Sequence, residues 1–106
     1  VYAVINASDT DGYAGQSGRI VIAEGLVVST GQWRNLTFLN FGRGRGQPSV
    51  VISASVRRQI EAQGLKPGEF AGRRLRIRGL LQLRPAPRIE IFSAAALEFL
   101  PALQSR

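Results

Sequence analysis

The alternation of apolar and polar residues predicts a chain built mainly of β-strands. The clearest case is residues 74–84, where apolar side chains occupy every second position, the period of a strand with one buried face. Residues 88–92 alternate in the same way. We therefore expect a core face that contains Leu75, Ile77, Leu81, Leu83, Ile89 and Ile91.

Three further strands are predicted from Ile- and Val-rich or alternating segments, at residues 19–29, 33–41 and 50–53. Gly25 lies inside the first of these and predicts a bend or bulge, and residues 30–32 are the expected turn. Residues 1–5 fit a short strand at a sheet edge.

The segments between and beyond these strands have less regular patterns. Residues 6–18 are rich in Ser, Asp and Gly, which predicts a loop with at most one helical turn. Residues 94–100 fit either a continued strand or a final helical turn. Residues 56–63 place Val56 and Ile60 on one side, which predicts a helix of about two turns capped by Ser55 and ended by Gly64.

The resulting order, three strands, a helix and two strands, predicts an all-β fold: a five-stranded OB-fold Greek-key barrel with one short helix between strands three and four. An SH3-like barrel is the alternative, but that fold is not expected to contain a helix at this position. We expect an N-terminal strand or linker segment over residues 1–17, the OB-fold domain over 18–100 and a tail over 101–106. Because the chain begins at Val1 rather than Met, we expect it to be a segment of a longer protein.

The composition excludes several kinds of chemistry. The 106 residues include no Cys, His or Met, so thiol or imidazole nucleophiles, disulfides and metal sites built on those ligands are excluded. No acid, base and nucleophile constellation is visible, and no apolar run approaches the ~20 residues of a membrane helix. We expect a protein that is not an enzyme and has no metal or cofactor; its compartment cannot be read.

The charge favours a polyanionic partner. The net charge is +7, and thirteen of the fourteen basic residues are Arg. The distribution is uneven, because residues 1–30 carry −2 and residues 31–106 carry +9. Arginine binds phosphate through paired N–H groups and stacks on bases. A general role in solubility is the alternative explanation.

Four segments, residues 18–27, 38–42, 75–79 and 87–91, resemble the OB-type nucleic-acid-binding domain of bacterial thermonuclease-family (staphylococcal-nuclease-like) proteins. The nuclease pattern of that family is absent here: residues 9–12 read Asp-Thr-Asp-Gly instead of Asp-Gly-Asp-Thr, and no Glu-x-x-Arg follows. The resemblance implies the binding domain without the catalytic domain.

Candidate binding residues cluster in the expected loops. Trp33 and Arg34 lie between strands one and two, and Arg84 and Arg88 bracket the loop between strands four and five. These loops flank the ligand cleft of an OB-fold, where an aromatic ring can stack on a base and Arg can contact phosphate. The alternatives are a rim aromatic that packs on the barrel and an ordinary solvated loop.

The second expected strand and the loop after it add three candidates. Arg43 and Arg45 lie in a Gly-rich loop, where backbone amides can approach phosphate. Phe38 is assigned to the outer face of its strand, because Thr37, Leu39 and Phe41 form the more apolar set and are assigned to the core.

Residues 73–78 carry four arginines, Arg73, Arg74, Arg76 and Arg78. Like charges on alternate strand positions repel one another unless they are paired. We expect ion pairs with Glu24 and Glu90 on the neighbouring strands, above all for Arg76.

Together these features predict a non-catalytic module that binds nucleic acid, single-stranded and with low sequence specificity. The alternative is a structural or protein-interaction domain that accompanies a nuclease or other partner domain. Oligosaccharide binding is a weaker option, because it asks for more aromatic residues and less charge.

Overall fold

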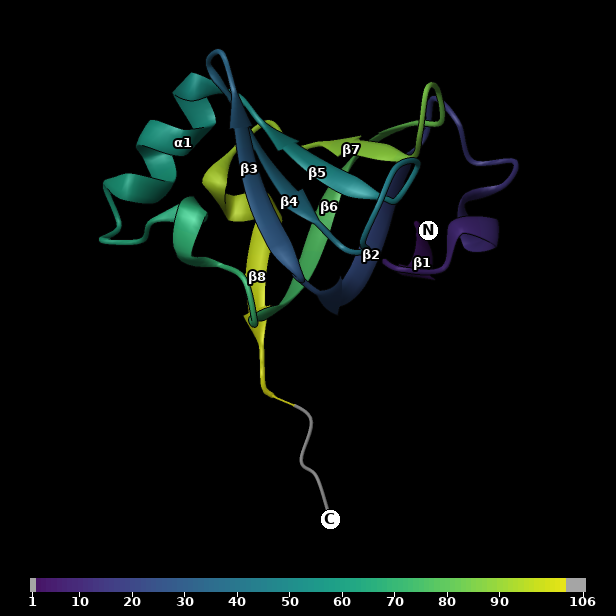
Figure 1. Cartoon of the computed structure of the whole chain (residues 1–106), viewed down its shortest axis with the longest axis horizontal. Helices are drawn as coiled ribbons and strands as arrows, with labels where there is room; N and C mark the ends of the chain where they lie inside the picture. Colours follow the sequence, from purple (N-terminus) through teal and green to yellow (C-terminus); the bar gives the residue numbers. More distant parts are fainter. Residues whose placement is uncertain (1, 103–106) are drawn as a thin grey trace.

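The computed structural model describes residues 2–102, so Val1 and most of the expected tail, residues 103–106, lie outside the described residues. Within them the chain forms one eight-stranded sheet, one α-helix and three 3-10 turns (Figure 1). The strands are β1 (Ala3–Asn6), β2 (Ile20–Leu26), β3 (Ser29–Trp33), β4 (Leu36–Asn40), β5 (Ser49–Ile52), β6 (Arg74–Gln82), β7 (Arg88–Glu90) and β8 (Leu97–Leu100). The helix is α1 (Ala54–Glu61), and the turns are η1 (Thr10–Tyr13), η2 (Pro67–Glu69) and η3 (Ala94–Ala96).

The sheet order is β1-β2-β6-β7-β5-β4-β3, with β8 also beside β6. The expected edge strand is present as β1, parallel to β2. The prediction of a five-stranded barrel is wrong in two respects: there are eight strands, and their pairing is an open path. The β-rich fold with one helix between β5 and β6 is confirmed.

Two of the expected segments have different bounds. The expected first strand, residues 19–29, ends at Leu26 as β2, and β3 already begins at Ser29. The Val27 amide donates to the Arg73 carbonyl, whereas the next amide, of Val28, donates to the Asn40 carbonyl. The chain thus leaves β6 and joins β4 at this bend. The expected last strand, residues 88–92, is present as β7, and residues 94–100, which fit either a strand or a helical turn, form both: η3 and then β8. β7 and β8 pair with opposite ends of β6.

The predicted turn at residues 30–32 is also wrong, because these residues lie inside β3 and pair with β4. The hairpin turns at Arg34 and Asn35 instead, where Arg34 has a φ of 56°. Gly31 was the residue that suggested a turn. Its position in β3 is open: no atom lies within 4 Å of where its Cβ would be, so the strand loses no packing contact by having a glycine there.

The inner face of the sheet forms one hydrophobic core. Five of the six expected core residues of β6, β7 and the residues that follow these strands are buried, as are Thr37, Leu39 and Phe41. Leu83 is only half-buried, contrary to prediction, because β6 ends at Gln82 and Leu83 begins the loop.

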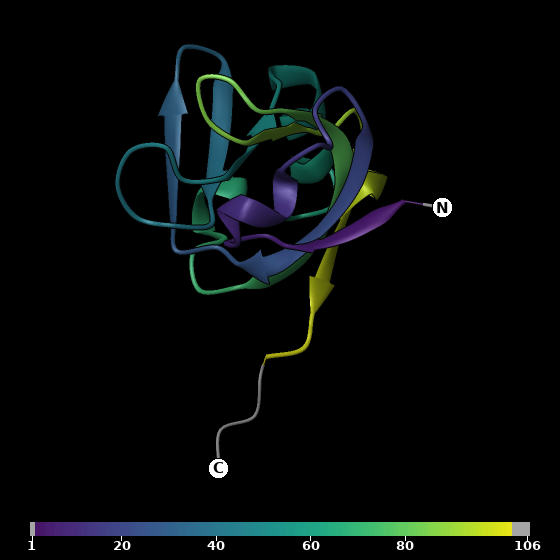
Figure 2. The ribbon, with the colours of Figure 1, turned by 90° about the vertical axis from the view of Figure 1, so that its right-hand side faces the viewer.

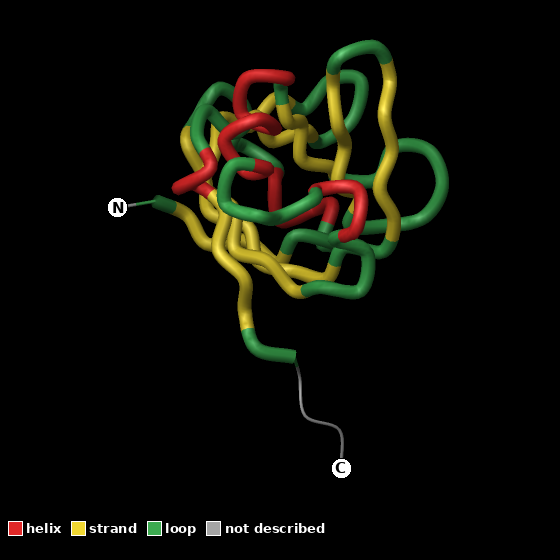
Figure 3. Tube along the Cα trace, turned by 90° about the vertical axis from the view of Figure 1, so that its left-hand side faces the viewer, coloured by secondary structure: helices red, strands yellow, loops and turns green. Residues whose placement is uncertain are grey.

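The two ends of the curled sheet are covered by helical segments. α1 covers one end with Val56 and Ile60 (Figure 3), and η1 lies at the opposite end in Figure 1. The helix begins two residues earlier than predicted, because the side chain of Ser53, not Ser55, accepts a hydrogen bond from the Val56 amide at 3.2 Å.

The N-terminal segment contributes directly to this core. Tyr13 is fully buried, and its hydroxyl donates to the Ala7 carbonyl at 2.7 Å. The Ala7 amide in turn donates to the Glu24 carbonyl, so the segment packs along β2. Burial raises the pKa of Tyr13 well above its ordinary value, and the charge of Asp9 adds to the shift.

Gly79 on β6 lies directly against the backbone of β7. A Cβ there would lie 2.4 Å from the backbone oxygen of Glu90. We expect Gly79→Ala to lower the free energy of unfolding by about 2–3 kcal/mol, since the strand itself would have to move. Urea unfolding measures this. Gly68→Ala is the matched control, because its added methyl group meets open space, and an equal loss in both variants would contradict the explanation.

Tyr13→Phe removes the donor to a buried carbonyl, so we expect a loss of about 1–3 kcal/mol in unfolding free energy at neutral pH. The folded chain also holds the Tyr13 proton more tightly than the unfolded chain does. Stability should therefore fall as the pH rises past the ordinary tyrosine pKa of about 10. Urea unfolding between pH 7 and 11 should show a shallower decline in the Phe variant; an equally steep decline would contradict this.

Candidate nucleic-acid interface

The outer face of β4, β5 and β7 carries aromatic, aliphatic and charged side chains. Strand register aligns Phe38 with Val51 and Val51 with Glu90 across the three strands. Phe38 is half-buried while Thr37 and Leu39 on either side of it are buried, so Phe38 faces outward as predicted. We call this surface, formed by Leu36, Phe38, Val51, Arg88 and Glu90, the β4–β5–β7 face.

A groove of about 350 Å³ crosses this face. Its walls include two of the predicted arginines, one from the β6–β7 loop and one from β7. The lining residues are Leu36, Val51, Gln82, Arg84, Arg88 and Glu90. The structure therefore brings Arg84 and Arg88 together around one concave site.

Arg88 also connects the groove to Phe38. Its guanidinium carbon lies 5.8 Å from the centre of the Phe38 ring, within the outer limit of a cation–π contact. The guanidinium lies over the ring, and both are flat groups on which a nucleic-acid base can stack, while the guanidinium can also bind a phosphate.

The β3–β4 hairpin turn adjoins the groove. Trp33 is 60% exposed and pairs across the hairpin with Leu36, a groove residue. The guanidinium carbon of Arg34 lies 4.7 Å from the centre of the Trp33 ring. In Figure 1 this turn and the β6–β7 loop project in the same direction at the two ends of the face. The exposure of Trp33 argues against the alternative of a ring packed on the barrel.

Arg43 and Arg45 lie outside the groove. Both are exposed on the loop between β4 and β5. The end of that loop adjoins the β6–β7 loop, because the Ser49 amide donates to the Pro87 carbonyl at 3.1 Å. Figure 2 shows the β3–β4 turn, the β4–β5 loop and the β6–β7 loop together. These two arginines could extend a basic path from the groove, but they do not line it.

Four groove residues were not predicted: Leu36, Val51, Gln82 and Glu90. Val51 lies between the apolar residues Val50 and Ile52 and is itself buried, so its outward direction had no signal in the pattern. The outward direction of Glu90 did have a signal in the sequence, because Glu90 alternates with the buried Ile89 and Ile91. The prediction, however, made Glu90 a partner of Arg76.

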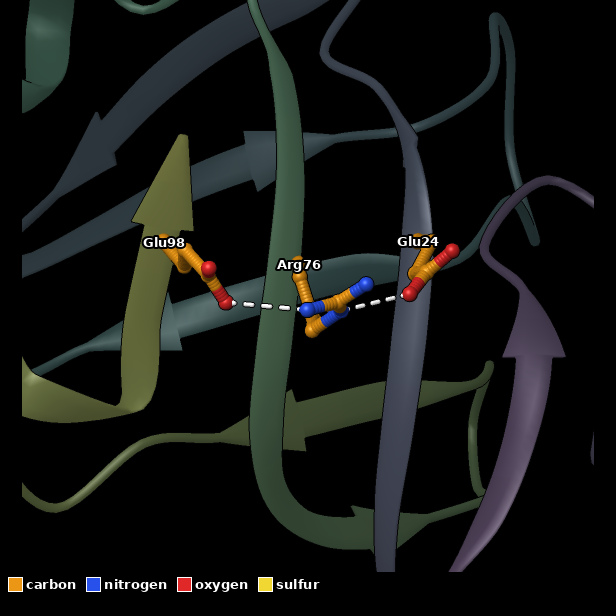
Figure 4. Close-up of polar contacts among 3 residues, drawn as sticks. All are labelled: Glu24, Arg76 and Glu98. Carbon is orange, nitrogen blue, oxygen red and sulfur yellow. Dashed lines mark hydrogen bonds and ion pairs between the residues drawn. The ribbon is translucent and has the colours of Figure 1, made fainter. Parts of the chain in front are cut away.

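That assignment is wrong, because β8 rather than β7 flanks this part of β6. Arg76 pairs with Glu24 on β2 and with Glu98 on β8, the latter at 3.1 Å (Figure 4). The hydrogen bond to Glu24 is the main cause that raises the Arg76 pKa above its ordinary value. The pairing with Glu24 is confirmed.

The arginines near Arg76 differ in their surroundings. Arg74 donates to the Pro101 carbonyl at 3.0 Å, and the Arg73 guanidinium carbon lies 4.2 Å from the centre of the Phe99 ring. Arg78 is exposed. Two of the four arginines in this group, Arg74 and Arg76, therefore already have oxygen partners within the chain.

Comparisons with known proteins support the fold. No family model and no curated protein sequence matches the chain, so the resemblance to the thermonuclease family remains a prediction. Solved structures do match. The chain is 14% identical to a chain of the Stn1–Ten1 complex of S. pombe, with a TM-score of 0.56 over 78% of this chain and 59% of that one.

Two other matches extend over most of the chain. An asparaginyl-tRNA synthetase from Entamoeba histolytica is 15% identical, with a TM-score of 0.61 over 98% of this chain but only 24% of the enzyme. OBody AM1L10, solved bound to hen egg-white lysozyme, is 15% identical, with a TM-score of 0.57 over 82% of this chain and 84% of the OBody. These neighbours are OB-fold proteins, and the likeness establishes an OB-like fold.

The ion pairs of Arg76 should contribute to stability in a salt-dependent way. We expect Arg76→Ala to lower the melting temperature at low ionic strength, because two carboxylates on neighbouring strands lose their partner. The difference from the wild type should shrink in 1 M NaCl, since exposed charges are then screened. Thermal melting monitored by circular dichroism checks this, and a difference unchanged by salt would show that packing rather than charge is responsible.

Proposed function

We propose that the chain is a non-catalytic module that binds single-stranded nucleic acid, with low overall sequence specificity, through the β4–β5–β7 face. The observation that carries the proposal is the groove lined by Arg84 and Arg88, of which Arg88 also contacts the outward-facing ring of Phe38. The surface supplies the two contacts that single strands need, an aromatic ring for a base and positive charge for the backbone.

The shape of the surface favours a single strand over a duplex. In a duplex the faces of the bases are stacked on one another and are not available to a flat protein ring. Phe38 lies within the sheet surface and can be reached only by a base that has left its stack. The exposed Trp33 ring on the adjoining hairpin offers a second stacking position.

The same fold in other proteins is compatible with this proposal but does not decide it. One of the matching proteins is a tRNA synthetase, an enzyme named for a nucleic-acid substrate, yet this chain spans only 24% of it. We transfer none of its catalytic activity, because the likeness extends over only this part of the enzyme. The structure shows no group of three or more Asp or Glu placed to hold a metal ion among residues 2–102.

A protein-interaction domain is the second candidate function. Its support is a set of exposed apolar side chains away from the groove, Tyr2, Val4 and Phe92, and the OBody that is bound to lysozyme. No helix within the described part of the chain is long and apolar enough to cross a membrane. A chain that binds no oligonucleotide at low salt would favour this second function.

Binding to a fluorescently labelled 12-nucleotide thymidine strand, measured by anisotropy across salt concentrations, tests the proposal. We expect micromolar or weaker affinity and, for about four phosphate contacts, a logarithmic salt slope of roughly −3. Arg84→Ala combined with Arg88→Ala should weaken binding and flatten the slope by about 1–1.5. Trp33→Ala should weaken binding by about five-fold or more with the slope nearly unchanged, since stacking carries no charge.

A matched double variant separates a site from general attraction. Arg19→Ala combined with Arg58→Ala removes the same charge from two exposed positions outside the β4–β5–β7 face. It should flatten the slope less than the groove variant does. Equal effects of both double variants, or binding that instead follows Arg74 and Arg78, would contradict the assignment of the face.

A further inference from the structure

The groove that we propose for nucleic acid contains a carboxylate. Glu90 is exposed and lines the groove together with Arg84 and Arg88. Among residues 2–102 the ion pairs are those of Arg57 with Glu61 and of Arg76 with Glu24 and Glu98. Glu90 therefore has no cationic partner within this described part of the chain, in a site whose other charged residues are arginines.

The Glu90 carboxylate is free even though a cationic residue, Arg88, is its neighbour on the same strand. Arg88 and Glu90 are two residues apart on β7, so their side chains share a face. The Arg88 guanidinium nevertheless lies beside the Phe38 ring rather than within ion-pair distance of Glu90. A carboxylate that only balanced local charge would be expected to bind this neighbour. Its acceptor oxygens stay available to a ligand.

The register places Glu90 where the edge of a stacked base would reach. Phe38, Val51 and Glu90 form one row across β4, β5 and β7, and two strand spacings amount to about 10 Å. A base that takes the place of the Arg88 guanidinium over the Phe38 ring extends across the buried, apolar Val51, and its outer edge then approaches the Glu90 side chain. The flanking arginines remain for the phosphates.

A carboxylate selects among bases because it only accepts hydrogen bonds. Guanine presents two adjacent donors, its N1–H and its N2 amino group, which match the two carboxylate oxygens. Adenine and cytosine each present one amino group beside a ring nitrogen that repels the carboxylate, and thymine and uracil present one N–H between two carbonyls. Resting on the proposed function, we infer that Glu90 makes the groove prefer guanine at the base that stacks on Phe38.

The experiment compares three 12-nucleotide thymidine strands that carry guanine, adenine or inosine at every third position. Inosine keeps the N1–H of guanine and lacks the N2 amino group. We expect the guanine strand to bind about ten-fold more tightly than the adenine strand, at the lower end of discrimination by a paired contact. The inosine strand should lie between them.

Glu90→Gln should abolish most of this preference while raising affinity for the strand of thymidine alone, because a negative charge leaves a polyanion site. Glu69→Gln is the matched control, since it removes an exposed carboxylate outside the groove and should keep the preference. Equal binding of guanine and adenine strands, or a preference that survives Glu90→Gln, would refute the inference and leave the proposed function intact. The absence of binding to every strand would refute both.

Discussion

The bend at Val27 and Val28 is the constraint on which the rest of the structure depends. A chain of this length must bury one face of a sheet against itself, because one short helix is too small to cover the face of eight strands. At the bend two consecutive amides donate to carbonyls on opposite sides of the core, Arg73 beside β6 and Asn40 on β4. The sheet therefore curls around one core, and the helical segments α1 and η1 cover its ends.

The curl also determines which surface is free for a ligand. Once the inner face is filled by buried Ile, Leu and Val, the outer side chains of β4, β5 and β7 have no layer packed on them. Phe38 lies on this outer side and is only half-buried there, whereas Val51 next to it is buried, with 8% of its surface exposed. The partly exposed Phe38 ring and the guanidinium of Arg88 give the face an aromatic and cationic character.

Positive charge alone does not identify a binding surface in this chain. The densest group of arginines lies on β6, yet Arg76 there is held by Glu24 and Glu98, and Arg74 donates to a backbone carbonyl. Arg84 and Arg88 are fewer but line a groove next to an aromatic ring. The difference lies in the partners of each guanidinium, which depend on strands far apart in the sequence.

The sequence by itself determined the local features of this protein. Strict alternation identified β6 and its buried Leu75, Ile77 and Leu81, and the relative polarity of two faces placed Phe38 outward, because period-two patterning depends only on neighbouring residues. The pairing of Arg76 with Glu24 and the candidates Arg84 and Arg88 came from the same patterning combined with an assumed strand order. Only the tertiary structure decided that a new strand, β3, begins at Ser29, that residues 94–100 form both a turn and β8, that Glu98 rather than Glu90 completes the Arg76 ion pairs, and that Glu90 lies in the groove. These outcomes depend on where backbone hydrogen bonds change partners, at Val28 and around η3. The choice of partner is made among strands that are far apart in the sequence, so the local alternation of side chains does not reveal it.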